Sequence, residues 1–209
     1  MITVEIKGIN ELMQRLDPRK VQSAARAALE RTKTSAKAEA VRQIRQVWNI
    51  KKKDLEQKAS GAERIKVSGR VGEDLTATLT FYSGGISLAY FGAREFKISA
   101  RARKAMAAKR GQPYRSGQRT AVRVQVMKGK TTTLTQFFGK VKFGKDKSGT
   151  HRGVFRRTGK GRLPIIESQS VGVATMVNQP RVMKPLQQFI ADTFNKRITH
   201  ELKQRKVID

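Results

Sequence analysis

Few residues of this 209-residue sequence could take part in acid–base or metal chemistry. There are two histidines, His151 and His200, and no cysteine. His151 lies in a predicted loop rich in glycine and lysine, His200 lies on the polar side of a predicted helix, and neither has a second nitrogen or carboxylate at the spacing of a metal site. The lack of cysteine excludes disulfides, thiolate ligands and a cysteine nucleophile. The sequence therefore predicts no metal site.

The acidic residues do not form a catalytic set either. Glu73 and Asp74 are the only adjacent carboxylates. They occupy a predicted hairpin turn, not the paired arrangement that a two-metal nuclease requires. The run Gly159-Lys160-Gly161 has part of a phosphate-binding loop without the full G-x-x-x-x-G-K-[ST] spacing, and there is no G-x-S-x-G motif. We expect no catalytic residues, no cofactor and no enzymatic activity.

Positive charge is the strongest feature of the sequence. The formal net charge is +29, and residues 96–169 carry 20 lysines and arginines against two acids, Asp146 and Glu167, which gives this segment a net charge of +18. A small soluble domain usually has a net charge of about 2–8 in magnitude. An excess of this size calls for a polyanion or an acidic protein neighbour, and the alternative is a solvated basic face.

The basic residues of this segment form two clusters, and the second is interleaved with Phe137, Phe138, Phe143 and Phe155. Lysine and arginine on glycine-rich loops can neutralise phosphates without reading bases. The phenylalanines could stack on single-stranded bases, but at least three of the four are more simply explained as inward residues of short strands. The candidate DNA- or partner-contacting residues are Arg101, Arg103, Lys104, Arg110, Arg115, Arg119, Lys140, Lys142, Lys145, Lys147, Arg152, Arg156, Arg157, Lys160 and Arg162.

Apolar spacing places these clusters between two long helices. Asp17 and Pro18 give a helix start. The apolar stripe that follows consists of Val21, Ala25, Ala28, Leu29, Thr32, Ala36, Val41, Ile44 and Trp48. It indicates one core helix, or a helix of which part faces another subunit. After Gln179-Pro180, a similar spacing predicts an amphipathic C-terminal helix that ends near Arg205.

Shorter elements are predicted between the two helices and at the N-terminus. The expected strands are 1–9, the hairpin of 64–71 with 75–82, 86–91, and an edge strand at 163–166 that begins with proline. The expected short helices are 50–58 and 170–177. These elements alternate without an internal repeat, so the pattern predicts an α+β fold.

Residues 97–162 have few apolar runs, and stretches such as 140–152 lack the apolar content to hold themselves folded. This segment is either a β-excursion that orders on assembly or a set of ordinary strands joined by mobile loops. We expect it to be partly ordered, with at least one long flexible loop. The prediction is a single domain over 1–209, in which long N- and C-terminal helices pack on an antiparallel β-sheet core and 97–162 is the basic excursion.

One segment resembles a known family. The run His151-Arg-Gly-Val-Phe-Arg-Arg-Thr-Gly-Lys-Gly-Arg-Leu-Pro-Ile-Ile-Glu-Ser, followed by Ser170-Val-Gly-Val-Ala-Thr-Met-Val, is similar to the signature of the phage minor tail protein Z family. That signature joins a G-V-F-R-R strand, a basic turn, an R-L-P-I strand and a short helix. Ser170-Val171-Gly172-Val173 lacks the proline that the family has at this point. The basic N-terminal helix, Lys51-Lys52-Lys53, the hairpin and the C-terminal helix extend the resemblance more loosely.

The resemblance implies a structural virion protein that completes the head-proximal end of a siphophage-like tail and helps join tail to head. Such a protein would form a homo-oligomeric ring, expected to be hexameric, around the channel for genomic DNA. Its neighbours would be the tail terminator or tail tube and the head connector. It would be located in the virion neck, and in the host cytoplasm during assembly.

Two other functions are compatible with the composition. One is a free nucleic-acid-binding protein without sequence preference, for which we expect steeply salt-dependent binding by the monomer. The other is a basic membrane-surface protein, suggested by the amphipathic C-terminal helix. That helix has three cations in its last turn and no tryptophan anchor, and the sequence has no apolar stretch that could span a membrane. We therefore expect no membrane partner.

Overall fold

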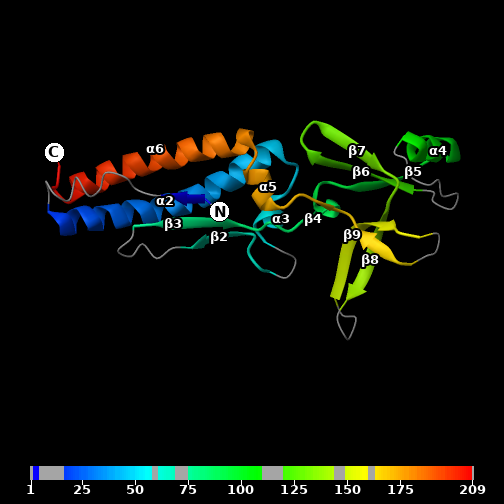
Figure 1. The fold of residues 1–209 in the computed structure, drawn as a ribbon, viewed down its shortest axis with the longest axis horizontal. Helices are drawn as coiled ribbons and strands as arrows, with labels where there is room; N and C mark the ends of the chain where they lie inside the picture. Colours follow the sequence, from blue (N-terminus) through cyan, green and yellow to red (C-terminus); the bar gives the residue numbers. More distant parts are fainter. Residues whose placement is uncertain are drawn as a thin grey trace. The chain divides into compact units, whose positions relative to one another are not determined.

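The computed structural model describes residues 2–4, 17–57, 61–68, 75–109, 120–143, 149–159 and 163–208. It is an α+β protein with a long N-terminal helix, a long C-terminal helix and small antiparallel sheets, which confirms the predicted fold class (Figure 1). The chain divides into two compact units: unit 1 contains 1–45, 52–83 and 173–209, and unit 2 contains 46–51 and 84–172. The basic segment 97–162 lies within unit 2. The assignment of the whole chain to a single domain stays a prediction.

The long helix α2, Pro18–Val47, begins at the predicted residue. Asp17 caps it, because its Oδ1 accepts the backbone N–H of Arg19 at 3.0 Å, and Pro18 occupies the first helical position. Every residue of the predicted apolar stripe is buried within the chain itself. This result favours a core helix over a stripe that faces another subunit.

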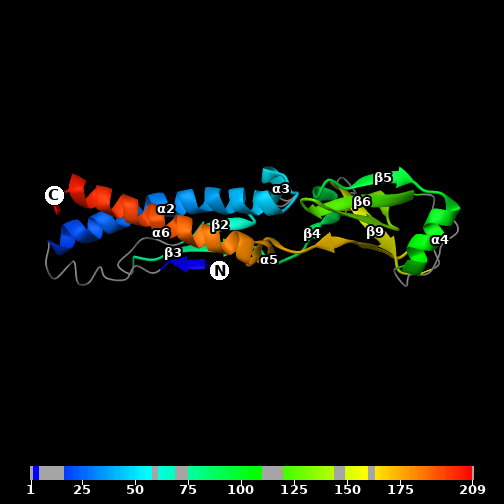
Figure 2. The same ribbon diagram turned by 90° about the horizontal axis from the view of Figure 1, so that it is seen from above.

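In unit 1, α2 lies between the C-terminal helix α6, Pro180–Gln204, and a small sheet (Figures 1 and 2). The sheet has the order β1-β3-β2 and is antiparallel. Its strands are β1 (Ile2–Val4), β2 (Ile65–Ser68) and β3 (Ala77–Phe81), so the predicted hairpin is confirmed. Two short helices, α3 (Lys52–Glu56) and α5 (Val173–Val177), complete the described part of unit 1.

Alanines let α2 approach its neighbours closely, and larger residues fill the space around them. Val21, Ala24 and Ala25 of α2 form one core cluster with Leu75 and Leu202. Leu186 and Val182 of α6 are fully buried as well. Unit 1 thus has an apolar core of its own.

Unit 2 is built from three small antiparallel sheets, with the orders β5-β6-β7, β10-β9-β8 and β11-β4. Its elements are β4 (Ile86–Ser87), the 3-10 helix η1 (Leu88–Tyr90), β5 (Arg94–Lys97), α4 (Ala100–Lys109), β6 (Thr120–Met127), β7 (Lys130–Leu134), β8 (Phe137–Phe143), β9 (Gly149–Arg157), β10 (Ile165–Glu167) and β11 (Gln169–Ser170). The core includes Trp48, Phe91, Val122 and Val154, which are nearly or completely buried. β10 is an edge strand, as the sequence predicted.

The structure corrects three predictions for this region. Residues 86–91 do not form one strand: β4 ends at Ser87, whose Oγ accepts the Ala89 N–H at 3.4 Å and caps η1. The predicted helix 170–177 begins only at Val173, because residues 169–170 pair with β4 as β11. Helix α4 was not expected within the β-region.

A fourth correction concerns the described part of 140–152, which was expected to lack the apolar content to hold itself folded. β8 and β9 pair along seven residues, from Phe137 opposite Phe155 to Phe143 opposite Gly149. Residues 144–148 lie outside the described part. Buried Val154 and Phe155 anchor the base of the hairpin, and the backbone ladder carries the pairing outward. Apolar content at one end therefore suffices to order the two strands.

Candidate polyanion-binding surface

Two arginines of unit 2 lie directly opposite each other across strands β5 and β6. The register pairs Arg94 with Arg123, and Phe96 with Ala121. Both arginines are exposed. The guanidinium carbon of Arg123 lies over the Phe96 ring, 5.0 Å from its centroid. The strand alternation places both cations and the ring on the same face of the sheet.

Strands β8 and β9 repeat this arrangement. Lys140 lies opposite Arg152, and Phe138 lies opposite Val154. Lys140 and Arg152 are exposed, and the guanidinium carbon of Arg152 lies over the Phe138 ring, 4.8 Å from its centroid. Each site thus consists of two opposed cations and a phenylalanine diagonal to the stacked arginine. We call the two sites the β5–β6 cation pair (Arg94, Arg123 and Phe96) and the β8–β9 cation pair (Lys140, Arg152 and Phe138).

Like charges directly opposite each other in a sheet are destabilising, and carboxylates do not compensate them here. Among the described residues, no ion pair involves any of the four cations. Glu95 alternates to the other face of β5, where its Oε1 accepts the Phe138 N–H at 3.4 Å. Within the described part of the chain, no carboxylate therefore offsets the repulsion within each pair.

A further cation extends the β8–β9 cation pair along the same sheet face. Arg156 is exposed and lies four residues after Arg152, so the strand alternation places both on one face. It lies opposite Ile166, whose side chain is 45% exposed. This face of the sheet carries Lys140, Arg152 and Arg156 without a described acidic residue between them.

The opposite face of this sheet corrects the interpretation of His151. It is a strand residue of β9, not a loop residue, and its Nε2 lies 2.6 Å from Oε1 of Glu167 in β10. The Glu167 carboxylate passes over Gly153, and the edge of the Phe155 ring lies close to the same glycine. The pair therefore joins the edge strand β10 to β9. Within the described ranges, no three His, Asp or Glu side chains are grouped so that they could hold a metal ion.

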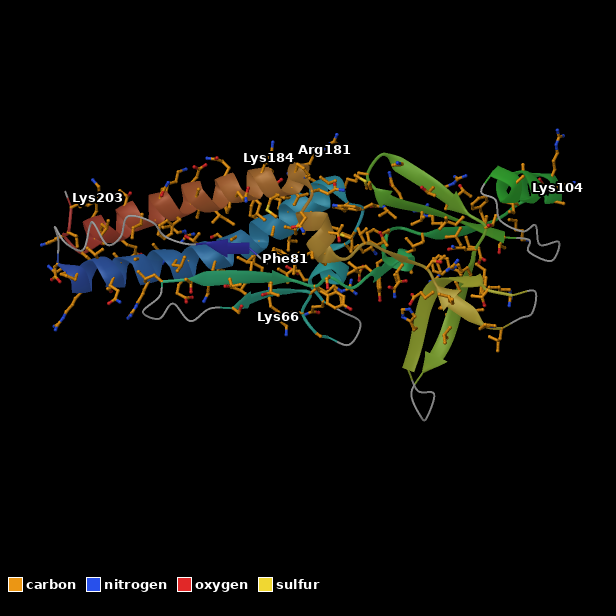
Figure 3. All side chains as sticks on the ribbon, in the orientation of Figure 1. Lys66, Phe81, Lys104, Arg181, Lys184 and Lys203 are labelled. Carbon is orange, nitrogen blue, oxygen red and sulfur yellow. The ribbon has the colours of Figure 1, made fainter. Side chains whose placement is uncertain are left out.

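Helix α4 is a second concentration of positive charge. Its ten residues include Arg101, Arg103, Lys104 and Lys109 and no acid. Ser99 caps it, because its Oγ accepts the Ala102 N–H at 3.2 Å. Every described side chain of α4 is exposed or half-exposed, and Lys104 extends away from the helix (Figure 3).

The structure brings some of the predicted residues together and separates others. Lys140, Arg152 and Arg156 share one sheet face. Arg157 lies on the other face, where its guanidinium carbon is 4.9 Å from the Phe137 centroid. Arg101, Arg103 and Lys104 belong to α4, and Lys142 lies in β8 at the position opposite Thr150. The candidates outside the described residues are Arg110, Arg115, Arg119, Lys145, Lys147, Lys160 and Arg162.

Neither Arg94 nor Arg123 is among the candidate residues predicted from the sequence, and Arg94 also lies outside the basic segment. Arg94 stands next to Glu95, so its local charge looked balanced. The alternation Arg94-Glu95-Phe96-Lys97 is the signal that could have identified a strand with Arg94 and Phe96 on one face.

The phenylalanines agree in part with the prediction that most point inward. Phe155 is buried, and Phe137 and Phe138 are half-buried, each with an arginine over its ring. On the ring face that each arginine covers, a nucleic-acid base could stack only by displacing that arginine. The side chain of Phe143 lies outside the described part.

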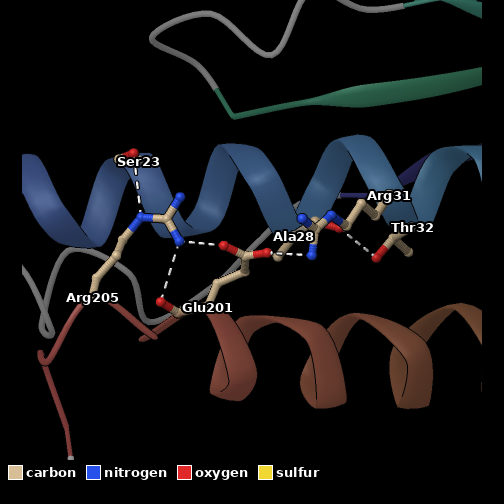
Figure 4. Close-up of polar contacts among 6 residues, drawn as sticks. All are labelled: Ser23, Ala28, Arg31, Thr32, Glu201 and Arg205. Atoms are coloured by element: carbon tan, nitrogen blue, oxygen red, sulfur yellow. Dashed lines mark hydrogen bonds and ion pairs between the residues drawn. The ribbon is translucent and has the colours of Figure 1, made fainter. Parts of the chain in front are cut away.

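Unit 1 differs from the cation pairs of unit 2, because its buried carboxylates are paired with arginines. Glu201 of α6 is 5% exposed; its Oε1 lies 2.6 Å from Nη1 of Arg31, and its Oε2 accepts a hydrogen bond from Arg205 (Figure 4). The hydrogen bond from Arg205 lowers the pKa of Glu201 below its usual value, with Arg31 adding to the effect against the opposing effect of burial. In α2, hydrogen bonds from Arg42 and Gln43 likewise lower the pKa of Glu39.

Comparison of the chain with protein-family models, with curated proteins and with solved structures found no match. Within the described part of the chain, no helix combines the length and the apolarity needed to cross a membrane.

Proposed function

We propose that this protein is a non-enzymatic structural protein of a tailed-phage virion. It completes the head-proximal end of the tail and helps join tail to head, as one subunit of a ring around the DNA channel. The observation that carries the proposal is the segment 151–177. It resembles the minor tail protein Z signature in sequence, and it folds as strand β9, edge strand β10 and short helix α5, the order that the resemblance implies.

The charge distribution supports a place beside an anionic neighbour. The two cation pairs hold opposed positive charges without described carboxylate partners, and residues 96–169 have a net charge of +18. A ring of such subunits would concentrate positive charge around its axis, which is favourable only beside a polyanion or an acidic ring. Genomic DNA and acidic faces of the tail terminator, tail tube or head connector are the proposed neighbours.

Microscopy of virions tests the proposed location. Antibody raised against the purified protein should label intact particles at the junction of head and tail, and it should not label the tails made when the gene is deleted. Labelling confined to the distal tip of the tail, or the absence of the protein from purified virions, would refute the proposal. Deletion should also leave tails that fail to join heads.

The ring is tested separately by the number of copies of the chain in tail complexes. One chain has a mass of 23.5 kDa. Native mass spectrometry of tail complexes should show the subunit in a closed multiple, expected to be six copies. A single copy per tail would overturn the ring but not the location.

The cation pairs also favour a second candidate, a free nucleic-acid-binding protein without sequence preference. This alternative expects tight binding of duplex DNA or RNA by the isolated monomer at about 50 mM salt, with a steep loss as salt increases. It also expects the protein to be absent from virions. No binding at low salt would eliminate it.

A further inference from the structure

We infer that the β5–β6 and β8–β9 cation pairs are binding sites for the phosphate groups of a nucleic-acid backbone. The inference deepens the proposed function and rests on it for the source of the nucleic acid, which is the genomic DNA of the channel. The geometry of the two sites carries the argument.

Opposition of the cations is the first step. Directly opposite residues of an antiparallel pair have Cβ atoms about 4.5–5.5 Å apart. Arg94 with Arg123, and Lys140 with Arg152, therefore present two positive charges to the same small volume above the sheet. A phosphodiester has two unesterified oxygens and can accept hydrogen bonds from both side chains at once. Binding would relieve the repulsion that each pair has in the free protein.

Stacking of the arginine is the second step. A guanidinium that lies over a ring is attracted by the electron-rich face and retains the N–H donors at its edges. Arg123 is held in this way by Phe96, and Arg152 by Phe138. Because the side chain is already ordered, less conformational entropy is lost when it binds phosphate. The repetition of one arrangement on two strand pairs makes a shared purpose the simplest explanation.

The apolar surroundings favour nucleic acid over an acidic protein. Protein interfaces are centred on exposed aromatic or aliphatic anchors. Here the residues opposite the rings, Ala121 and Val154, are fully buried, and the half-buried rings each have an arginine over one face. The exposed residues of the two pairs are cations, as in protein–nucleic acid interfaces. On the face of the β8–β9 cation pair, Ile166 opposite Arg156 is exposed as well. Backbone contacts of this kind carry no sequence information directly, so binding should be independent of sequence.

The test is the salt dependence of binding between the full-length protein and a labelled mixed-sequence duplex of roughly 30 base pairs, long enough to contact several phosphates. The test variant is Arg123→Gln with Arg152→Gln. The matched control is Arg45→Gln with Arg181→Gln, which removes the same charge from exposed arginines of unit 1 (Figure 3). Circular dichroism and thermal unfolding establish that both proteins are folded.

For the test variant we expect the slope of log affinity against log salt to fall by about two, with a loss in affinity of roughly one to two orders of magnitude near 0.1 M salt. The control should retain most of the affinity and slope. Equal losses in the two variants would show that only the total charge matters, and would overturn the inference. Unchanged binding by the test variant would also overturn it.

Two further variants test the stacked arginine itself. Arg152→Lys keeps the charge and Phe138→Leu keeps apolar bulk, and each removes the stacked geometry. Each should weaken binding, by roughly two- to five-fold for Phe138→Leu. Wild-type affinity in both variants would show that stacking of Arg152 on Phe138 does not order the arginine for phosphate binding, and would contradict this part of the inference.

Polyglutamate is the probe for an acidic protein partner. It should compete poorly with the duplex at equal charge concentration. Competition as effective as that of unlabelled DNA, lost in the same test variant, would assign the sites to acidic protein and overturn the inference. Virion labelling decides the proposed function independently: labelled necks without DNA binding refute only the inference, and DNA binding without virion labelling refutes only the proposed location.

Discussion

Lys140 of β8 and Arg152 of β9 lie directly opposite each other, with both side chains exposed on one sheet face. Cross-strand neighbours are the units through which side chains stabilise a sheet, and two like charges in this position oppose folding. The pair is therefore not explained by stability. A feature that weakens the free protein and is repeated at Arg94 and Arg123 is better explained by an anionic partner.

This relationship predicts a trade-off between stability and binding. Replacing Lys140 with glutamate turns repulsion into a cross-strand ion pair with Arg152. We expect the free energy of unfolding at low salt to increase by about 0.5–1 kcal/mol, and duplex DNA binding to weaken. Urea unfolding followed by circular dichroism measures the first effect, and its size should shrink as salt screens the charges.

The matched control for this prediction is Lys66→Glu. Lys66 is an exposed strand residue of β2 that lies opposite Thr80, so no opposed cation is relieved by the change. Its unfolding free energy should change little. Equal stabilisation by both substitutions would show that reduction of the net charge, and not the local pair, is responsible.

The buried carboxylate of Glu201 predicts a second effect on stability. Glu201→Gln leaves Arg31 and Arg205 without their anionic partner between α2 and α6. We expect a loss of about 1–2 kcal/mol in the free energy of unfolding, at the low end for bonds to charged groups because the Arg31 side chain is 58% exposed and can turn to water. Thermal or urea unfolding measures the loss.

Asp192→Asn is the control on the same helix. Asp192 is exposed, and its Oδ1 accepts a hydrogen bond from Gln188 that an asparagine oxygen can also accept. The change should therefore leave stability nearly unaltered. A loss as large as that of Glu201→Gln would mean that the helix charge matters and the buried pair does not.

The lowered pKa values of Glu39 and Glu201 predict how stability depends on pH. Hydrogen bonds from Arg42 and Arg205 hold the pKa of each carboxyl below the 4.5 of an ordinary glutamate. A carboxyl of this kind binds protons more readily in the unfolded state. Its contribution is therefore fully present above about pH 4.5 and is lost as the pH falls through the folded pKa.

Unfolding measured at steps between pH 6 and pH 2 should show this acid limb, with the midpoint falling below about pH 4.5. The double variant Glu39→Gln, Glu201→Gln should be less stable at pH 6 and should have a flatter acid limb. If the double variant loses stability with falling pH as steeply as the wild type does, other carboxyls are responsible for the acid sensitivity.

The long helices could be predicted because local signals agree with tertiary packing. Asp17 and Pro18 define the start of α2, and the apolar spacing that follows is the face that the chain buries. Helix α4 gave no such signal. Its alanines, arginines and lysines favour a helix intrinsically, but Met106 is its only large apolar residue, so its sequence has no apolar periodicity.

The site could be predicted in composition but not in arrangement. The excess of cations in 96–169 identifies the region, yet the opposition of Arg94 and Arg123 depends on the register of two strands separated by 98–119. The contact of His151 with Glu167 likewise joins residues from different strands. Register is fixed by side-chain burial on both faces and by the connecting turns, and a single sequence does not specify which strands become neighbours.

The crowding around Gly153 gives the last prediction. A methyl group added at this position would lie 2.5 Å from Oε1 of Glu167 and 3.0 Å from the Phe155 ring. Gly153→Ala should therefore displace the Glu167 carboxylate, break its 2.6 Å contact with His151 and lower the free energy of unfolding by about 1–3 kcal/mol. Gly159→Ala is the control, because nothing lies within 4 Å of the added methyl.

Removing the carboxylate with Glu167→Ala should partly relieve the crowding at Gly153, so the double variant Gly153→Ala, Glu167→Ala should lose less stability than the two single losses combined. Strict additivity in urea unfolding would show that Gly153 and Glu167 are not coupled, in contradiction to the crowding seen in the structure.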